Sequence, residues 1–338
     1  MNPIVSVLLP VYNGELYLRF AIDSIISQTF IEWELIIIND GSYDKSREII
    51  DYYDDSRIVA IHSDRNRGLI TSLNIGIRSA HGKFIARMDA DDIALTTRFQ
   101  EQVRYLHEHP EVGVVGSNAN LINAEGKYIS KIRMPKSHHV ILWEMMFQCS
   151  LLHPTVMMRT DLLKKVGGYS TDCIHSEDYE LWYRLSLVTK FHNIQLPLLG
   201  LRKHSQNVSH VHQTIQLNNS NKIRFKFVSH IGKESDNYLK SFKKDYIHIK
   251  SNSVNIYLNQ LMSLLDNYYQ EKHLTIKEYK SIKGFVSKHM LRTYYFNYRK
   301  QNSERILIWV LQNWSSLFKK LLEIIFRKIK MRKQDLLL

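Results

Sequence analysis

Apolar runs and amphipathic segments alternate along the first 115 residues. Short apolar runs predict strands at 4–9, 35–38, 58–61, 84–88 and 112–115. Between these runs, apolar residues at helical spacing predict helices at 16–29, 46–53, 69–80 and 97–109. Strands that alternate with helices form a mostly parallel sheet with helices on both faces. The pattern therefore predicts an α/β fold.

The pattern is less regular after residue 120. It predicts a strand at 155–158, a short helix at 161–166, and a helix at 178–187 with Ser176 as its cap. Beyond residue 212, glycine and proline nearly disappear, which predicts an α-helical C-terminal region with helices at 254–269 and 276–298. We therefore expect two domains, at 1–212 and 213–338.

Composition narrows the class of protein. The chain has 338 residues, of which 44% are hydrophobic and 23% charged, as in ordinary globular proteins. Its two cysteines, Cys149 and Cys173, exclude a disulfide framework and lie in no zinc-binding pattern. No signal peptide is found, and no apolar stretch approaches the roughly 20 residues that span a membrane. We therefore expect a cytoplasmic protein.

The chain is basic, with a net charge of +13 that would suit nucleic acid, anionic lipid or an anionic substrate. The segment 306–329 has an apolar stripe with Trp314 and Phe318, beside a cluster of basic residues at the end of the chain. This pattern is typical of a helix on an anionic membrane surface. The alternative is a helix that packs on the protein itself or on a second subunit, which would form a homodimer. We expect no nucleic acid, because no recognised binding motif accompanies the charge.

An acidic cluster, Asp89-Ala90-Asp91-Asp92, follows the predicted strand at 84–88. Like charges this close disfavour each other's ionisation unless a cation lies among them. Mg²⁺ is commonly held by one or two carboxylates together with the phosphate oxygens of a substrate. The cluster therefore predicts a metal–diphosphate site, and the alternative is a solvated acidic turn before the helix that starts near Thr97.

Other polar residues also follow predicted strands, where open α/β sheets bind their ligands. The first strand leads to Asn13-Gly14 and the second to Asn39-Asp40-Gly41-Ser42. Asp40 could accept hydrogen bonds from a nucleobase or a ribose, and Gly41 permits a sharp turn. The loop Asn66-Arg67-Gly68 could support a nucleoside or a phosphate. Each cluster also fits an ordinary turn or a basic surface loop.

Two further positions could carry chemistry. Glu177-Asp178 opens a helix, so that Asp178 could take the proton of an attacking hydroxyl; the alternative is that both carboxylates only stabilise the helix dipole. His204 could be a metal ligand, because neutral imidazole binds metals such as Mn²⁺. With 16 histidines in the chain, a surface histidine is the simpler interpretation.

Taken together, these motifs resemble those of the family 2 glycosyltransferases of the GT-A fold, whose sheet is Rossmann-like. The series includes Pro10-Val11-Tyr12-Asn13-Gly14 and Gly167-Gly168-Tyr169 as well as the clusters above, in the family's order. The resemblance covers about the first 210 residues. One departure is Asn39, where many members have a second aspartate.

The resemblance implies a role for each motif. Asp178 would be the catalytic base. Asp91, with Asp89 and His204, would bind Mn²⁺ or Mg²⁺. The nucleotide sugar would be held by the loops at the strand ends, through Pro10, Tyr12, Asn13, Asp40, Asn66, Gly68, Asp89 and Ala90.

It also implies the reaction. A hexosyl or N-acetylhexosaminyl group would pass from a nucleotide sugar, a UDP-sugar, to a hydroxyl of a glycan or lipid-linked acceptor in cell-surface polysaccharide biosynthesis. The transfer would invert the anomeric configuration. No Gln-x-x-Arg-Trp motif is present, which favours a non-processive enzyme on the inner face of the cytoplasmic membrane. The alternative is a non-catalytic nucleotide-binding or membrane-associated scaffold. A dehydrogenase is excluded because no G-x-G-x-x-G follows the first strand.

Overall fold

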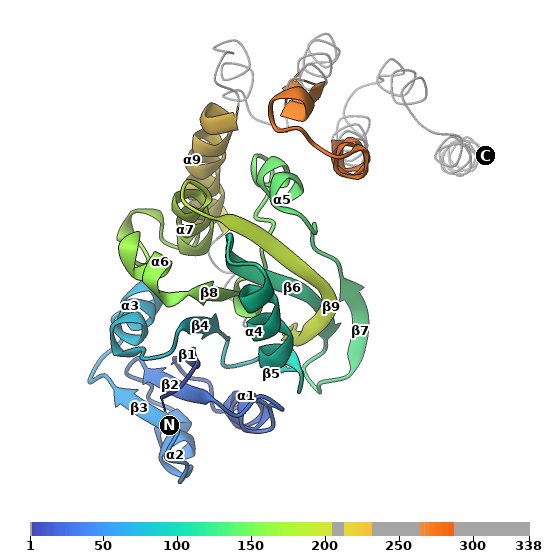
Figure 1. Ribbon diagram of the computed structural model, residues 1–338. Helices are drawn as coiled ribbons and strands as arrows, with labels where there is room; N and C mark the ends of the chain where they lie inside the picture. Colours follow the sequence, from blue (N-terminus) through green and yellow to red (C-terminus); the bar gives the residue numbers. More distant parts are fainter. Residues whose placement is uncertain (1, 205–212, 232–263, 267, 287–338) are drawn as a thin grey trace, which may run out of the picture. The chain divides into compact units, whose positions relative to one another are not determined.

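The computed structural model describes residues 2–204, 213–231, 264–266 and 268–286 (Figure 1). The chain forms two compact units, Met1–Val228 and Ser229–Leu338. The boundary falls later than residue 212, because the helix α9 (Gln213–Ile231) begins within the first unit. The division into the two predicted domains stays a prediction.

Four parallel strands form the first part of the sheet. They are β1 (Val5–Val11), β2 (Trp33–Asn39), β3 (Ile58–His62) and β4 (Phe84–Arg87), in the spatial order β3-β2-β1-β4. Leu8 of β1 lies opposite Ile36 of β2 and Arg87 of β4. Every residue of β2 and β4 is buried, as expected for parallel strands covered on both faces. The predicted alternation of strands and helices is confirmed here.

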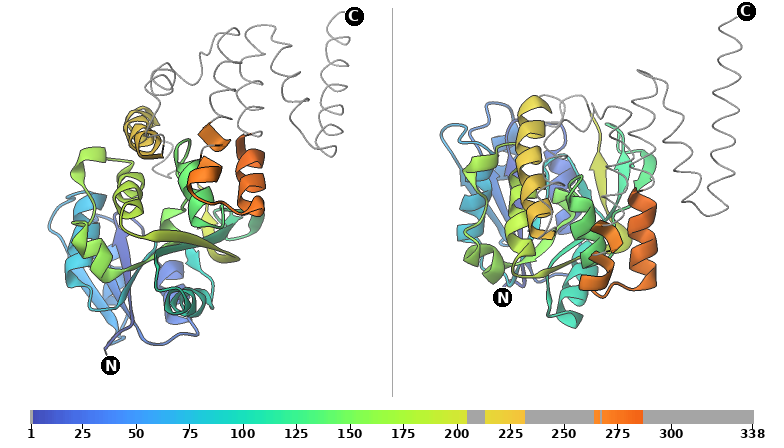
Figure 2. Two further views of the ribbon diagram at one scale, coloured as in Figure 1. Left: turned by 45° about the horizontal axis from the view of Figure 1, so that its top comes forward. Right: turned by 90° about the horizontal axis from the view of Figure 1, so that it is seen from above.

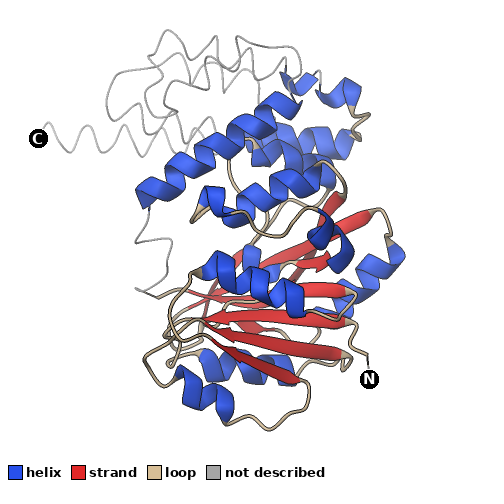
Figure 3. Ribbon diagram, turned by 90° about the vertical axis from the view of Figure 1, so that its left-hand side faces the viewer, coloured by secondary structure: helices blue, strands red, loops and turns tan. Residues whose placement is uncertain are grey.

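Helices cover both faces of this sheet (Figure 3). On one face, Val7 and Ile37 share a buried core with residues of α1 (Leu18–Ile26), α2 (Ser46–Asp51) and α4 (Arg98–Glu108). On the other face, Leu8 and Ile38 lie against Gly76 of α3 (Leu69–Ser79). The alternating side chains of each strand thus pack on opposite layers. The α/β fold class is confirmed.

The second half of the sheet is mixed rather than parallel. It contains β8 (Met157–Arg159), β6 (Val112–Ile122), β9 (Lys190–Arg202), β5 (Ile93–Ala94) and β7 (Tyr128–Ile132). β8 runs antiparallel to both β4 and β6, while β9 runs parallel to β6. Within the described residues, nine strands form one sheet. The sequence pattern predicted part of β6 and β8 but missed β5, β7 and β9.

Four more helices surround this half, α5 (His138–Met145), α6 (Thr160–Lys165), α7 (Glu177–Ser186) and α9, with short 3-10 turns at His153–Thr155 and Thr171–Cys173. In both views of Figure 2, α9 lies near α7. Phe227 of α9 stacks on Tyr179 of α7, with ring centroids 5.7 Å apart. α9 therefore belongs to the packing of the first unit as far as Val228.

Two local predictions hold only in part. The helix predicted at 16–29 spans 18–26, and its apolar residue Phe20 and the preceding Leu16 are 59% and 63% exposed. The buried face of α1 is instead formed by Leu18, Ala21, Ile22, Ser24 and Ile25. Ser176 lies at the N-cap position of α7, but its hydroxyl bonds Gln216 O and Ser220 Oγ of α9 rather than capping the helix.

In the second unit, the structure describes helix at 264–266, 268–271 and 276–286. These segments fall within the helices predicted at 254–269 and 276–298, except for residues 270 and 271. The predicted amphipathic helix at 306–329 lies outside the described residues. Among the helices that the structure describes, none has the length and apolar character needed to span a membrane.

Candidate active site

The loops after β1 and β2 are joined by hydrogen bonds. Asn13 N donates to Ser42 Oγ at 3.0 Å, and Tyr43 N donates to Asn13 Oδ1 at 3.1 Å. Asn13 adopts a φ of 51°, a left-handed conformation that asparagine tolerates better than most residues. Tyr12 is 48% exposed and meets the Tyr43 ring edge-on, at 6.1 Å between centroids. Tyr12 therefore keeps nearly half of its surface exposed despite this contact.

Asp40 connects these loops to the loop after β3. Its carboxylate is buried and accepts hydrogen bonds from the backbone N–H groups of Arg67 and Gly68, both at 2.8 Å. Gly68 N also donates to Asn66 Oδ1 at 2.9 Å. Two acceptor positions of the carboxylate remain for other donors. Asp40 therefore shapes the loop that contains Asn66 and Gly68, and its contact with a nucleoside stays a prediction.

Gly41 makes this arrangement possible. Its φ is 69°, and a Cβ at this position would overlap the backbone of Arg65. Only glycine adopts this conformation at no steric cost and leaves room for the neighbouring chain. Since Pro10 pairs with Ile38 just before these turns, the structure gathers Pro10, Tyr12, Asn13, Asp40, Asn66 and Gly68 at the carboxyl ends of β1, β2 and β3.

Three carboxylates converge after β4. One oxygen each from Asp89, Asp91 and Asp92 lies within 4.8 Å of the others, and among the described residues this is the group suited to a metal ion. Asp92 Oδ1 accepts from Arg202 N at 2.8 Å, whereas its buried Oδ2 has no hydrogen-bond partner in the described part of the chain. Burial, with the nearby charges of Asp89 and Asp91, holds the pKa of Asp92 well above its ordinary value.

The end of β9 brings His204 to this cluster. His204 Nε2 lies 2.8 Å from Asp91 Oδ2, across 113 residues of sequence. The imidazole also lies against Tyr17, with centroids 5.1 Å apart, and Arg202 Nε donates to Asp91 O at 2.7 Å. The site thus offers the carboxylates of Asp89 and Asp91, the imidazole of His204 and the buried Oδ2 of Asp92. This set of donor atoms fits a divalent cation such as Mn²⁺ or Mg²⁺.

Asp178 begins the helix α7 on another side of the site. Tyr179 N donates to its Oδ1 at 2.7 Å, and Cys149 Sγ lies 3.8 Å from its Oδ2. Burial raises the pKa of Asp178, while the Tyr179 N–H and the charge of Arg87 lower it in part. The neighbouring Glu177 is also buried, which together with the Asp178 charge raises its pKa to about 7.

Arg87, at the end of β4, interacts with the carboxylates of the site. Its guanidinium is buried and contacts the Asp89 carboxylate, and its charge acts on Glu177 and Asp178. Sequence reasoning assigned no role to Arg87, although one signal was available. A charged residue inside an otherwise apolar strand, 84–88, requires a buried partner of opposite charge.

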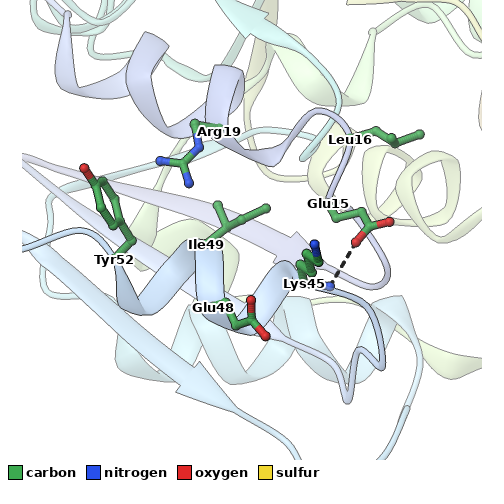
Figure 4. Close-up of a pocket in the computed structure, with 7 residues that line it drawn as sticks. All are labelled: Glu15, Leu16, Arg19, Lys45, Glu48, Ile49 and Tyr52. Carbon is green, nitrogen blue, oxygen red and sulfur yellow. Dashed lines mark hydrogen bonds between the residues drawn. The ribbon is translucent and has the colours of Figure 1, made fainter.

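A surface groove of about 550 Å³ lies elsewhere, between α1 and α2 (Figure 4). Arg19 lies over the Tyr52 ring there, 4.9 Å from its centroid. The groove carries two acidic and two basic side chains and contains none of the candidate site residues. It is lined by Glu15, Leu16, Arg19, Lys45, Glu48, Ile49 and Tyr52.

Comparison with known proteins identifies the family. The model of the family described as glycosyl transferase family 2 matches residues 6–167. An uncharacterized glycosyltransferase of Haemophilus influenzae is 32% identical over 233 residues, which are 66% of this chain and 72% of that protein. The chain belongs to glycosyltransferase family 2. The family resemblance of its sequence motifs is thereby confirmed.

Two other glycosyltransferases are similar to the chain. The O-antigen biosynthesis glycosyltransferase WbnJ of Escherichia coli is 32% identical over 54% of this chain and 71% of its own length. The bifunctional glycosyltransferase pgtA of Dictyostelium discoideum is 33% identical over 62% of this chain. This match spans only 34% of pgtA, so the present chain corresponds to about a third of that protein.

Two solved structures share the fold. Staphylococcus aureus TarS 1–349, in complex with UDP-GlcNAc, gives a TM-score of 0.52 at 18% identity and covers 87% of each chain. The mannosyltransferase PcManGT of Pyrobaculum calidifontis, in complex with GDP-Man and Mn²⁺, gives 0.51 at 14% identity and covers 93% of this chain and 84% of its own. The predicted fold class of this family 2 member is confirmed.

Proposed function

We propose that this chain transfers a sugar from a UDP-sugar to a hydroxyl group of a glycan or lipid-linked acceptor, with inversion at the anomeric carbon. The observation that carries the proposal is the meeting of His204 with Asp91, beside Asp89 and Asp92, at the sheet edge where the β1 and β2 loops lie. The complex of TarS with UDP-GlcNAc supports a nucleotide-sugar donor. The naming of WbnJ supports a role in cell-surface polysaccharide biosynthesis.

The donor would be held by two groups of residues. Pro10, Tyr12, Asn13 and Asp40 would line the nucleoside pocket, with Asn66 and Gly68 closing it from the β3 loop. Asp89 and Ala90 would approach the ribose and diphosphate. Asp89, Asp91 and His204 would hold Mn²⁺ or Mg²⁺. A bound divalent cation supplies positive charge that offsets the negative charge developing on the diphosphate.

Asp178 would be the base. Its carboxylate would accept the proton of the acceptor hydroxyl, while the oxygen of that hydroxyl forms a bond to the anomeric carbon. The bond from the anomeric carbon to the diphosphate oxygen breaks, and the nucleoside diphosphate leaves. A single displacement of this kind inverts the configuration. Burial, which raises the pKa of Asp178, increases its ability to take up the proton.

The setting of the reaction is part of the proposal. We infer a non-processive enzyme at the inner face of the cytoplasmic membrane, because an acceptor linked to lipid would be presented there. The sugar, the acceptor and the linkage are to be found by assay. A non-catalytic nucleotide-binding or membrane-associated scaffold is the alternative function.

The substitution Asp178→Asn tests the base. It keeps the shape of the side chain and removes its ability to accept a proton, so we expect transfer to fall by about 10³-fold. Binding of UDP with Mn²⁺ should stay within a factor of two of wild type, as measured by calorimetry. A panel of nucleotide sugars with acceptor extracts would identify the donor first.

Two outcomes would count against this proposal. Transfer by Asp178→Asn at more than half the wild-type rate would remove Asp178 as the base. The second outcome concerns the wild-type chain. If it binds UDP with Mn²⁺ but shows neither transfer nor slow donor hydrolysis with any sugar of the panel, the scaffold is favoured.

A further inference from the structure

We infer that Tyr17 is a positioning residue, whose ring holds the His204 imidazole beside Asp91. The inference rests on the proposed function, because it takes His204 and Asp91 as ligands of the metal ion. Tyr17 lies immediately before α1, at its N-cap position, and its backbone N–H donates to Gly14 O at 3.1 Å. The ring thus belongs to the loop that follows β1, which also contains Asn13 of the expected nucleoside pocket.

The Tyr17 ring contacts two residues at the end of β9. The guanidinium carbon of Arg202 lies 4.6 Å from the centroid of the ring, within the range of a cation–π interaction. The imidazole of His204 has its centroid 5.1 Å from the same ring centroid, with 40° between the two planes. Tyr17 therefore joins the start of α1 to the end of β9, which are far apart in the sequence.

Arg202 provides a fixed surface for the ring. It is buried, its Nε donates to Asp91 O at 2.7 Å, and its backbone N donates to Asp92 Oδ1 at 2.8 Å. Its Nη1 also donates to the carbonyl oxygens of Asn123 and Ala124, at 3.2 and 2.7 Å. The ring therefore lies against a guanidinium that two loops hold in place.

His204 is less constrained by the sheet. β9 ends two residues before it, and Lys203 N still donates to Ile122 O at 2.9 Å. His204 follows this bond, so strand pairing alone does not set the direction of its imidazole. The Tyr17 ring restricts that direction, together with Asp91 Oδ2 at 2.8 Å from the imidazole Nε2. A metal ligand that is already held in its binding orientation loses less conformational freedom when the ion binds.

The alternative is that Tyr17 only stabilises α1. Tyr17 is half-buried and precedes the helix, and it is not part of the core that α1 shares with the sheet. Its hydroxyl has no hydrogen-bond partner among the residues that the structure describes. The buried face of α1 is formed by Leu18, Ala21, Ile22, Ser24 and Ile25. The contacts of the Tyr17 ring with the site therefore favour positioning over a role in the core.

The segment that carries Tyr17 is itself tied to the residues after β2. Gly14 N donates to Ser46 Oγ at 2.8 Å, and Glu15 N donates to Asp44 Oδ2 at 2.9 Å. These bonds fix the backbone from which the ring extends, and they do not depend on the ring itself. We therefore expect loss of the ring to weaken the metal-dependent part of nucleotide binding and to spare the rest.

The test measures how much Mn²⁺ increases the affinity for UDP. Calorimetry gives this Mn²⁺ gain as the ratio of the UDP dissociation constants without and with the ion. We expect Tyr17→Ala to reduce the gain about tenfold, as is typical for residues that support a metal ligand, and to leave the affinity without Mn²⁺ within about twofold of wild type. Tyr17→Phe keeps the ring and should keep the gain within about twofold.

Phe20→Ala is the matched control. Phe20 is another aromatic residue of α1, it is 59% exposed, and the guanidinium carbon of Arg202 lies 5.8 Å from its ring centroid. The substitution removes a contact with the same arginine and leaves the Tyr17–His204 contact, so the Mn²⁺ gain should stay within about twofold of wild type. Equal reductions in Phe20→Ala and Tyr17→Ala would overturn the inference, as would an unchanged gain in Tyr17→Ala.

A double-mutant cycle with His204→Ala separates positioning from a general loss of stability. His204→Ala should reduce the Mn²⁺ gain at least as much as Tyr17→Ala, and adding Tyr17→Ala to it should change the gain by less than about twofold. Full additivity would contradict the inference. If Tyr17→Ala fails to fold, Tyr17→Leu takes its place with the same expected results. A wild-type chain that binds UDP equally with and without Mn²⁺ would instead refute the proposed metal site, and the inference with it.

Discussion

Glu177 is a buried carboxylate at the start of α7, where it is 8% exposed and adjoins the charge of Asp178. Burial and that charge raise its pKa from 4.5 to about 7. The folded chain therefore binds this proton more tightly than the unfolded chain. The free energy of unfolding should fall as pH rises from about 4.5 to about 7, and should stay lower above that range.

The substitution Glu177→Gln removes this dependence. We expect it to raise the free energy of unfolding at pH 8 by up to about 3 kcal/mol, because the amide bears no charge to desolvate. At pH 4.5 the variant and wild type should unfold alike, which provides the internal control. Chemical denaturation at both pH values measures the difference. A gain of equal size at the two pH values would show that packing, and not ionisation, is responsible.

Among single residues, the sequence pointed to the acidic residues of the candidate site more readily than to the residues that interact with them. Asp40, Asp89, Asp91 and Asp178 could be selected as candidates because they follow apolar runs or begin a helix, although each position also fits a turn or a helix start. Arg87 and Tyr17 were not recognised, because each acts on residues far along the chain. The charge of Arg87 acts on Glu177 and Asp178. The ring of Tyr17 lies against His204. Spacing in sequence carries no information about such contacts.

Among the elements, α9 is tied to the segment that leads into α7. Asn219 Nδ2 donates to Ile174 O at 2.9 Å, and Ser220 Oγ lies 3.1 Å from the hydroxyl of Ser176. Asn219 is buried, so its removal leaves a carbonyl without a partner, which costs about 1–3 kcal/mol. The conformation of this segment includes His175, a non-glycine residue with a φ of 65°.

We therefore expect Asn219→Ala to lower the free energy of unfolding by about 1–3 kcal/mol. It should also reduce the rate of transfer more than UDP binding, since the segment leads directly to Asp178. Urea denaturation and steady-state kinetics provide the two measurements. The adjacent exposed Asn218→Ala is the control and should change neither quantity. Equal effects of the two substitutions would indicate a general loss of helix stability.

The elements show where periodicity is informative. Most helices and strands of residues 1–115 were predictable because β1, β2 and β4 are almost entirely buried apolar runs and the helices have one apolar face. β9 was missed because polar residues interrupt its 13 residues and Pro197 lies within them. β7 was missed because four of its five residues are exposed, so its place depends on pairing with β6 rather than on its own pattern.

For the whole molecule, the net charge and the charge of the site are opposite. The chain carries +13, yet the carboxylates of Asp89, Asp91 and Asp92 meet in one place. An overall positive potential favours the approach of an anionic nucleotide sugar, while the local cluster favours a cation. The fold class followed from the sequence, as did the grouping of Asp89, Asp91 and Asp92 after the strand β4. The mixed half of the sheet, in which β9 leads to His204, did not.

A cation bound by this cluster together with a nucleotide should stabilise the folded first unit. Ligand at 100 times its dissociation constant adds about 2.7 kcal/mol, because it binds the folded state and not the unfolded one. We expect UDP with Mn²⁺ to raise the melting temperature of wild type, and EDTA to abolish the rise. Asp91→Asn should show no rise under the same conditions, whereas Asp161→Asn, an exposed aspartate of α6, should respond as wild type does. An equal rise for UDP with and without the metal would show that Asp89, Asp91 and His204 do not hold a cation for the diphosphate.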